Sequence, residues 1–373
     1  MNPTSTSKRI LSVDVFRGMT IVLMILVNTP GTWSSIYAPF KHAVWHGCTP
    51  TDLVFPFFLF IVGTSIVLAY SSKKKNKSFK TYIKIFSRAA KLVVLGLFLA
   101  GFLVKFPFFK PFSELRLPGV LQRIGLVFFI AALLYLQSNW KTLLFIFIFI
   151  LVGYWLLMTQ IPIHGELPLL TKESNLAAYL DLKILTQAHI WKPKYDPEGL
   201  LSTLPSIATA IMGMFLGFLL KQKHYSKKQK LSYIIAIGII SILAGSLWSV
   251  VFPLNKALWT SSFVLYTGGW AFIIYSVIYY LTEIVHLKKW GIPFIYYGSN
   301  AISVYFLSSF IAKTFYLTHL PNGQTPHSFL YNTFFTSWIS IPKLSSLIYA
   351  FSVILIYYFL ARFLYKKKIF IKV

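Results

Sequence analysis

The chain has 373 residues, of which 56% are hydrophobic and 18% aromatic, while only 12% are charged. Its mean hydropathy of +0.67 is too high for a soluble domain of this length. The net charge of +27 would indicate nucleic-acid binding in a soluble protein. Here most basic residues fall in short loops between apolar segments, where they set topology and meet anionic headgroups. We therefore expect the lipid bilayer as a partner, and no nucleic acid.

The apolar segments last about 18 to 22 residues, which is typical of membrane-spanning helices and not of barrel strands. We predict an all-α integral membrane protein, a polytopic bundle of about ten transmembrane helices in a single domain over residues 1–373. The expected spans, in chain order, are Ile10–Asn28, Leu53–Tyr70, Tyr82–Val104, Leu117–Leu136, Thr142–Met158, Thr203–Leu220, Leu231–Phe252, Ser261–Leu281, Ile292–Ala312 and Leu344–Tyr365. His327–Ile341 is aromatic but too short to span, so we expect a re-entrant or interfacial helix there.

The connections between these spans alternate between basic and poorly basic. By the positive-inside rule this pattern places both termini in the cytoplasm and the connection from Asn28 to Asp52 outside. The single cysteine excludes an internal disulfide. The first span is long and lacks a small-residue cleavage site, so we expect it to remain as an anchor.

Polar side chains inside the apolar segments are informative, because each is unfavourable in hydrocarbon. Asp14 and Arg17 are three residues apart and share a helix face, either as a simple ion pair or with Arg17 turned toward an anionic ligand. Gln122 and Arg123 come early in the fourth span, where a guanidinium must pair with a carboxylate or line a wet cavity; we expect the cavity. Asn300 lies in the ninth span, where a buried amide more often joins helices than binds substrate.

Two polar motifs lie in the predicted outer connections. Asp196 and Glu198 belong to a DPEG motif before the sixth span, which is either a turn and helix start or a receptor for a cationic or hydroxyl-rich substrate. Asn255 and Lys256 form the turn of PLNKALW, either as an ordinary polar turn or as further substrate contacts.

The connection between the first two spans holds a cluster of side chains that bind zinc in other proteins. They are His42, His46, Cys48 and Asp52. The two histidines have the i, i+4 spacing of a helical pair, but Gly47 and Pro50 interrupt a helix there and no zinc signature follows. We therefore expect no metal.

The same connection also suits acid–base or nucleophilic chemistry. One of its histidines would act as general base or acyl acceptor, with Asp52 orienting the imidazole and Asn28 donating a hydrogen bond to an oxyanion. Spacing alone does not choose between His42 and His46.

Several segments together resemble one known family. They are SVDVFRG at Ser12–Gly18, FKHAVWHGCTPTDLVFPFFLFIVG at Phe40–Gly63, GVLQRIG at Gly119–Gly125, DPEGLLSTLPSI at Asp196–Ile207, PLNKALW at Pro253–Trp259 and GSNAISVY at Gly298–Tyr305. The chain is similar to the transmembrane acetyltransferase family of heparan-alpha-glucosaminide N-acetyltransferase and its bacterial relatives. The matches follow the family order and cover nearly the whole chain.

The resemblance implies an enzyme that takes acetyl-CoA from the cytosol and acetylates the amine of a glucosamine-type sugar across the membrane. It places the active histidine at His42, not at His46, with Asn28 and Asp52 as its catalytic neighbours. We assign the remaining polar residues to two binding sites. For acetyl-CoA these are Asp14, Arg17, Gln122, Arg123 and Asn300, and for the acceptor Asp196, Glu198, Asn255 and Lys256.

The resemblance also carries expectations about location and assembly. The large luminal domain of the lysosomal enzyme has no counterpart here, which indicates a form in the bacterial inner membrane acting on a periplasmic amino sugar or envelope glycan. The family also suggests a homodimer. Two alternatives stay open, an O-acyltransferase of a cell-envelope polysaccharide and a transporter that moves a small sugar or anion without chemistry.

Overall fold

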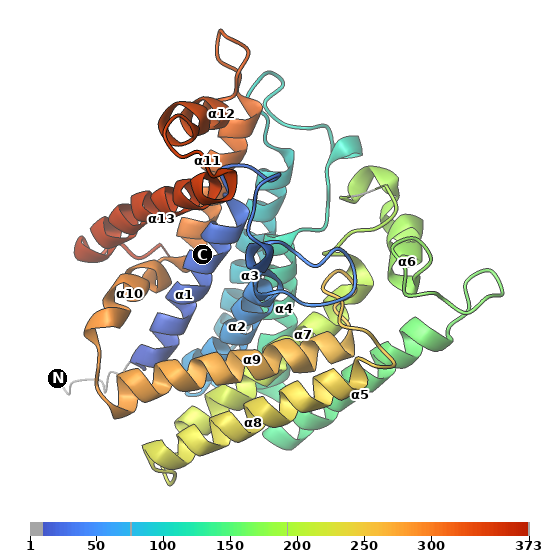
Figure 1. Cartoon of the computed structure of the whole chain (residues 1–373). Helices are drawn as coiled ribbons and strands as arrows, with labels where there is room; N and C mark the ends of the chain where they lie inside the picture. Colours follow the sequence, from blue (N-terminus) through green and yellow to red (C-terminus); the bar gives the residue numbers. More distant parts are fainter. Residues whose placement is uncertain (1–9, 75–76, 192, 372–373) are drawn as a thin grey trace.

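A computed structural model describes residues 10–74, 77–191 and 193–371 of the chain. The described residues are almost entirely helical, with β structure limited to isolated bridges. The helices, labelled in Figure 1, are α1 (Leu11–Asn28), α2 (Val54–Tyr70), α3 (Phe79–Gly101), α4 (Val120–Gln137), α5 (Trp140–Gln160), α6 (Leu176–Leu185), α7 (Leu200–Lys221), α8 (Lys227–Trp248), α9 (Ser261–Tyr279), α10 (Ile292–Ser299), α11 (Ala301–Leu317), α12 (Pro326–Tyr331) and α13 (Pro342–Lys366). The predicted all-α polytopic bundle is confirmed.

Eight helices in the described part of the chain are long and apolar enough to cross a membrane. They match the predicted spans except the third and the ninth. The third corresponds to α3, which carries four basic residues, Lys80, Lys84, Arg88 and Lys91. The ninth is divided because Asn300 leaves the helical conformation, with φ −128° and ψ 39°, and separates α10 from α11.

Helix α2 lies at the centre of the bundle and packs against α1, α4, α7 and α9. Its contact with α7 depends on small residues. A Cβ atom on Gly63 would lie 1.8 Å from the carbonyl oxygen of Ala210, and one on Gly213 would lie 1.8 Å from that of Phe60. Only glycine allows the two backbones to approach this closely, as in other membrane helix pairs.

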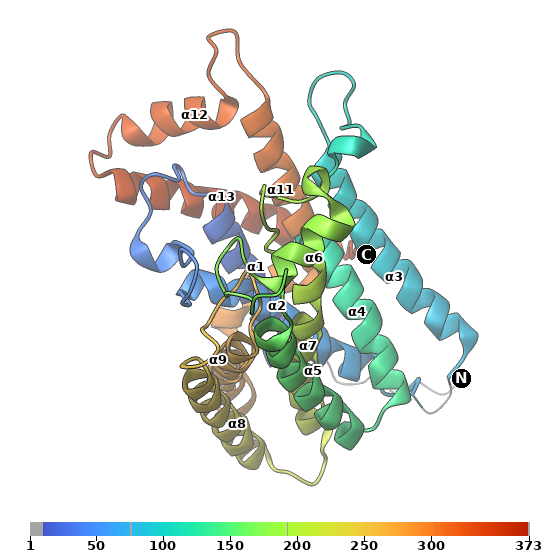
Figure 2. The ribbon, with the colours of Figure 1, turned by 90° about the vertical axis from the view of Figure 1, so that its right-hand side faces the viewer.

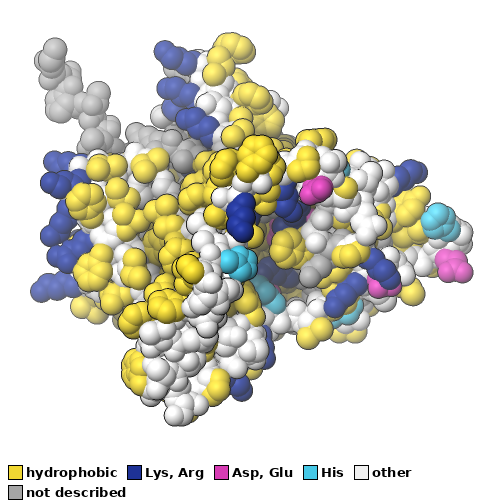
Figure 3. All heavy atoms as spheres, turned by 90° about the horizontal axis from the view of Figure 1, so that it is seen from above, with side chains coloured by type: hydrophobic (Ala, Val, Ile, Leu, Met, Phe, Trp, Pro, Cys, Tyr) yellow, Lys and Arg dark blue, Asp and Glu magenta, His cyan; other side chains and the backbone are white. Residues whose placement is uncertain are grey.

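The bundle has two chemically different ends. The basic end carries the start of α1 and the ends of α2 and α7, and the loop end carries the connections 29–53, 102–119, 161–199, 249–260 and 318–341. Figure 2 shows α12 at the top beside the end of α11, and α6 at the centre in front of the long helices. Figure 3 shows Lys and Arg side chains along one edge, and histidine, basic and acidic side chains around a hollow in the loop end.

The segment that was expected not to span the membrane forms a short helix. Helix α12 has 6 residues and continues through a π-helical turn to Thr336, so it is too short to cross. The side chains of Phe334 and Trp338 are 56% and 68% exposed. Exposed aromatic side chains of this kind suit the membrane interface.

Candidate functional site

The connection between α1 and α2 ends in a capping structure that fixes Asp52. The side chain of Thr49 and the carboxylate of Asp52 cap each other's backbone N–H groups, and Pro50 starts the short helical turn Pro50–Leu53. This reciprocal arrangement is a capping box, and proline suits the first helical position. The sequence TPTD therefore places the carboxylate at the mouth of α2.

The carboxylate of Asp52 holds the imidazole of His42. His42 Nδ1 lies 2.6 Å from Asp52 Oδ1, while Oδ2 accepts hydrogen bonds from Ala43 N at 3.0 Å, Thr49 N at 3.1 Å and Thr49 Oγ1 at 3.0 Å. The side chain of Asp52 is 1% exposed and that of His42 is 46% exposed. Within the described residues, His42 Nε2 makes no hydrogen bond. The ring is thus oriented through Nδ1 and presents Nε2 for chemistry.

Lys256 completes this cluster from the turn between α8 and α9. Its Nζ lies 3.5 Å from Asp52 Oδ1 and 3.2 Å from His42 Nδ1. Burial lowers the pKa of Lys256, while the charges of Asp52 and Glu198 act in the opposite direction. Lys256 was predicted to bind the acceptor sugar. The structure places it in direct contact with the predicted catalytic pair, His42 and Asp52.

Asn255 and His46 join the two loops. The Asn255 side chain accepts from Leu258 N at 2.9 Å, and its Nδ2 lies 3.4 Å from His46 Nδ1. The backbone N–H of Gly47 donates to the carbonyl of Leu254 at 2.7 Å. Asn255 is fully buried, so its amide serves the turn and the loop contact, and its predicted role as a substrate ligand gains no support.

The geometry gives the thiol of Cys48 no role as a metal ligand or a nucleophile. Burial raises the pKa of its thiol to about 12, and the charge of Asp52 adds to this, so the thiol stays protonated at neutral pH. Among the described residues, no three His, Cys, Asp or Glu side chains converge in a way that would hold a metal ion. The zinc alternative therefore has no geometric support.

Asn28 is the last residue of α1 and lies exposed at the loop end. In the described part of the chain its side chain makes no hydrogen bond, and none joins it to His42. Its catalytic role stays a prediction.

The two carboxylates of the DPEG motif are held by an arginine. Arg116 donates from Nε to Asp196 Oδ2 at 2.9 Å, and from Nη2 to Asp196 Oδ1 and Glu198 Oε2, both at 2.6 Å. Asp196 is 4% exposed and also accepts from Trp191 N and Glu198 N. Asp196 is thus fully engaged in structure, whereas Glu198 has one oxygen without a protein donor among the described residues.

An aromatic contact joins this carboxylate cluster to the histidine loop. The rings of Trp45 and Tyr195 lie 5.2 Å apart at a T-shaped angle. Trp45 also donates from Nε1 to the carbonyl of Leu170 at 2.7 Å. Because Trp45 follows His42 and Tyr195 precedes Asp196, the two polar clusters occupy adjoining segments of the loop end.

Arg123 lies beneath these loops. Its side chain is buried, its Nη2 donates to Gly199 O at 3.0 Å and to Ser202 Oγ at 2.5 Å, and its guanidinium carbon is 5.3 Å from the centre of the Trp259 ring. Its Nε and Nη1 have no hydrogen-bond partner among the residues that the structure describes. Arg123 therefore belongs to the loop end of the bundle.

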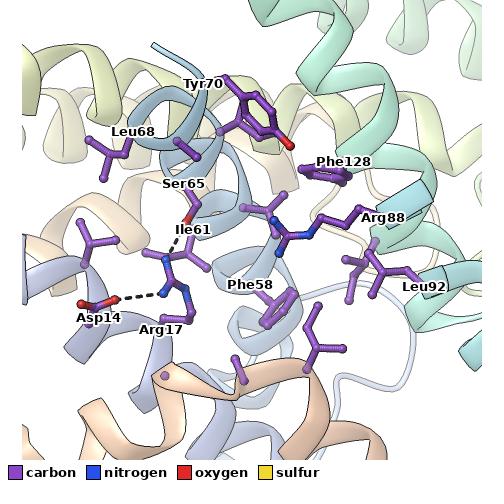
Figure 4. Close-up of a pocket in the computed structure, with 18 of the residues that line it drawn as sticks. Asp14, Arg17, Phe58, Ile61, Ser65, Leu68, Tyr70, Arg88, Leu92 and Phe128 are labelled. Carbon is purple, nitrogen blue, oxygen red and sulfur yellow. Dashed lines mark hydrogen bonds and ion pairs between the residues drawn. The ribbon is translucent and has the colours of Figure 1, made fainter. Parts of the chain in front are cut away.

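A cavity of about 1110 Å³ opens at the basic end. Figure 4 shows Arg17 and Arg88 pointing into it from opposite sides. Arg17 pairs with Asp14 at 3.0 Å and donates to Ser65 Oγ at 2.8 Å. The further basic lining residues are Lys84, Lys91 and Lys221. Small-molecule sites commonly measure about 300 to 1,000 Å³, so this cavity has room for a large ligand.

Residues 9–247 of the chain match a protein-family model, which is described as "Heparan-alpha-glucosaminide N-acetyltransferase, catalytic". The chain belongs to this family. It is 31% identical to heparan-alpha-glucosaminide N-acetyltransferase of Homo sapiens in an alignment of 358 positions that covers 80% of this chain and 52% of the human protein. It is also 31% identical to the protein of the same name from Mus musculus, in an alignment of 362 positions that covers 81% of this chain and 53% of the relative.

This chain therefore spans about half the length of the curated relatives that it matches. The match to the family model includes His42, Asp52 and Asp196 and ends before Lys256. The contact of Lys256 with Asp52 thus comes from the structure and not from the matched region.

The predicted acetyl-CoA residues separate into two groups. Arg17, Asp14 and Asn300 line the basic cavity, whereas Gln122 and Arg123 do not. Asn300 also uses its amide elsewhere, donating to Ile369 O at 3.0 Å and accepting from Ile371 N at 2.9 Å. Its clearest role is to hold the segment that follows α13.

Sequence reasoning missed the basic residues that α3 contributes to the cavity. Lys84, Arg88 and Lys91 have the i, i+4, i+7 spacing that puts them on one helix face. Three cations on one face of an apolar segment cannot all face lipid. That spacing was the available signal. The sequence signal for Arg116 was weaker, because it is a single arginine shortly before α4.

Proposed function

We propose that this chain is a membrane-embedded acetyltransferase that moves an acetyl group from acetyl-CoA to the amine of a glucosamine-type sugar. Acetyl-CoA enters at the basic end and the acceptor binds at the loop end. The observation that carries the proposal is the pairing of His42 with Asp52 at the end of the bundle opposite the basic cavity. The proposal also rests on the curated relatives, which are named heparan-alpha-glucosaminide N-acetyltransferase.

The basic cavity suits the anionic half of acetyl-CoA. None of Lys84, Arg88, Lys91 and Lys221 pairs with a carboxylate among the described residues. They are therefore available to phosphate groups, for which arginine and lysine are the usual ligands. The cavity continues along the apolar side chains of Phe58, Ile61 and Ile124, which suit the uncharged arm that carries the thioester.

The chemistry at His42 follows from its orientation. The sugar nitrogen attacks the thioester carbonyl carbon, and His42 Nε2 takes a proton from that nitrogen. The carbon–sulfur bond then breaks, and the same proton passes to the departing sulfur, which leaves as the thiol of CoA. Asp52 stabilises the imidazolium formed in between, and Asn28 is the proposed donor to the oxyanion. Transfer through an acetylated His42 is the alternative route.

The acceptor would lie near Glu198. Asp196 is already bound by Arg116, but the second oxygen of Glu198 has no donor among the described residues. A carboxylate at this position suits an ammonium group or sugar hydroxyls. The contribution to acceptor binding that we predicted for the DPEG motif therefore falls mainly on Glu198.

The orientation in the membrane is part of the proposal. The excess of Lys and Arg near the ends of α2 and α7 supports a cytoplasmic location of the basic end by the positive-inside rule. The loop end then faces outward, and a bacterial inner membrane with a periplasmic acceptor is the setting we propose.

The test uses purified protein, acetyl-CoA labelled in the acetyl group, and glucosamine. We expect labelled N-acetylglucosamine from the wild type and from His46→Ala, and none from His42→Ala. His46 is the matched control because it lies in the same loop and is held by Asn255.

Two outcomes would contradict the proposal. Label on no amino sugar would reject the activity, and an active His42→Ala beside an inactive His46→Ala would reject the site. Glucose and hydroxylamine distinguish the O-acyltransferase alternative, because hydroxylamine cleaves acetyl esters and leaves acetyl amides intact.

A further inference from the structure

The carboxylate of Asp52 is buried and needs a positive partner. A buried charge without a counter-charge is strongly unfavourable. Oδ2 is saturated by three neutral donors, two backbone N–H groups and the hydroxyl of Thr49. The counter-charge must therefore lie at Oδ1, where both His42 and Lys256 approach.

The geometry separates the roles of these two neighbours. His42 Nδ1 is 2.6 Å from Oδ1 and Lys256 Nζ is 3.5 Å from it. At 2.6 Å from an oxygen anion, Nδ1 must carry a proton and donate it. It then has no lone pair for Lys256, so the 3.2 Å approach of Nζ to Nδ1 is a contact between two donors. An ammonium beside the ring disfavours a second positive charge on the imidazole.

We propose that Lys256, and not a protonated His42, is the counter-charge of Asp52, so that His42 rests as a neutral imidazole with its proton on Nδ1 and Nε2 free. Lys256 is thus a positioning residue that acts through Asp52 and His42, and it does not need to touch the sugar. This inference rests on the proposed function for its catalytic meaning, because a neutral Nε2 is what a general base requires.

The other titratable groups around the cluster do not change this balance. Burial raises the pKa of Cys48 to about 12, so its thiol is neutral. Burial lowers the pKa of His46, with the Leu170 carbonyl opposing, and His46 is turned toward Asn255. Burial lowers the pKa of Lys256, and the negative charges of Asp52 and Glu198 oppose this by favouring its charged form. Asp52 and Lys256 are therefore the charges in direct contact with the ring.

The experiment reads the protonation of His42 directly. Diethyl pyrocarbonate modifies histidine only when the imidazole is unprotonated, and peptide mass analysis identifies which histidine carries the label. The modification rate of His42 is measured between pH 5.5 and 8 in the wild type, Lys256→Met and Lys256→Arg. The exposed His286, at the opposite end of the bundle, serves as reference in every sample.

In Lys256→Met we expect the rate at pH 7, relative to His286, to fall by at least about threefold, since loss of a neighbouring cation favours the imidazolium. Lys256→Arg should keep the wild-type profile. Superimposable profiles of wild type and Lys256→Met would overturn the proposal. The wild-type profile also tests the proposal. If His42 reacts only at a clearly higher pH than His286, then His42 is protonated and is itself the counter-charge of Asp52.

The result is independent of the acceptor. A wild type that acetylates no amino sugar would reject the proposed function while leaving the modification profiles unaffected. Conversely, an active wild type with unchanged Lys256→Met profiles would reject only the role of Lys256.

Discussion

Replacing Asp52 by Asn exchanges one carboxylate oxygen for an NH₂ group and has a predictable effect on the tautomer of His42. Asp52 Oδ2 accepts from Ala43 N, Thr49 N and Thr49 Oγ1. The amide oxygen of the variant must take this position, because an NH₂ group there would face two backbone N–H groups. An unsatisfied buried donor costs about 1 to 3 kcal/mol. The NH₂ group is therefore forced toward His42.

His42 Nδ1 then has to accept a hydrogen bond, and the ring proton moves to Nε2. A histidine in this tautomer cannot take a proton from the sugar amine through Nε2. General-base catalysis is worth about 10² to 10⁴ in rate, and each factor of ten is about 1.4 kcal/mol. We therefore expect Asp52→Asn to lower kcat by roughly 10² to 10⁴, which raises the barrier by about 3 to 5.5 kcal/mol.

The assay measures initial rates of acetyl transfer to glucosamine with purified protein. Acetyl-CoA binding provides the matched control, because the basic cavity lies at the other end of the bundle and its affinity should not change. Asp52→Asn protein that binds acetyl-CoA normally and keeps more than about a tenth of the wild-type kcat would refute the assignment of Asp52 as the residue that sets the tautomer.

Three further substitutions test the cavity and the loop end. Arg88→Gln should raise KM for acetyl-CoA about tenfold or more, since a charge-assisted bond to phosphate is worth about 1.5 to 3 kcal/mol. The control Lys141→Gln, on α5, should leave this KM unchanged. Equal effects in the two variants would contradict the cavity assignment. Arg116→Met should lower the apparent unfolding temperature because it leaves Asp196 buried without its cation. Adding Asp196→Asn should restore part of this loss. An unchanged unfolding temperature in Arg116→Met would show that the pair does not stabilise the fold. Burial raises the pKa of Asp181 in α6 from 3.8 to about 6, so the unfolded chain releases this proton at lower pH than the folded one and stability falls as pH rises from about 4 to about 6. Asp181→Asn should therefore raise the unfolding temperature at pH 8 but not at pH 4, with an effect on the order of 3 kcal/mol, and equal stabilisation at both values would contradict it.

The helices were largely predictable because hydrophobic length is a strong signal. The predicted span Leu53–Tyr70 differs from α2 by one residue at its start. The predicted span Ser261–Leu281 ends two residues after α9. The break at Asn300 was not predicted, since one amide in an apolar run does not reveal whether the helix continues. It follows from contacts with Ile369 and Ile371, which lie far along the chain.

The site was predictable where its geometry is local. The TPTD sequence fixes Asp52 through neighbouring backbone groups, and His42 is only ten residues away. The contact with Lys256 joins residues 214 positions apart, and the pairing of Arg116 with Asp196 spans 80 positions. No local pattern encodes such pairs. They depend on how the loops at one end of the bundle fold onto one another.

The distribution of carboxylates explains why the two ends of the bundle would bind different substrates. The chain has 9 Asp and Glu residues against 36 Lys and Arg, so most cations have no acidic partner. At the loop end, Asp52, Asp196 and Glu198 lie with Lys256 and Arg116 in compact clusters. In the basic cavity, the cations of α3 face a hollow without carboxylate partners among the described residues. Cations gathered around one hollow raise the local positive potential, which attracts an anionic ligand. A protein that balances its charges at one end and leaves cations unpaired at the other is therefore suited to hold a phosphate-bearing donor and an amine acceptor on opposite sides.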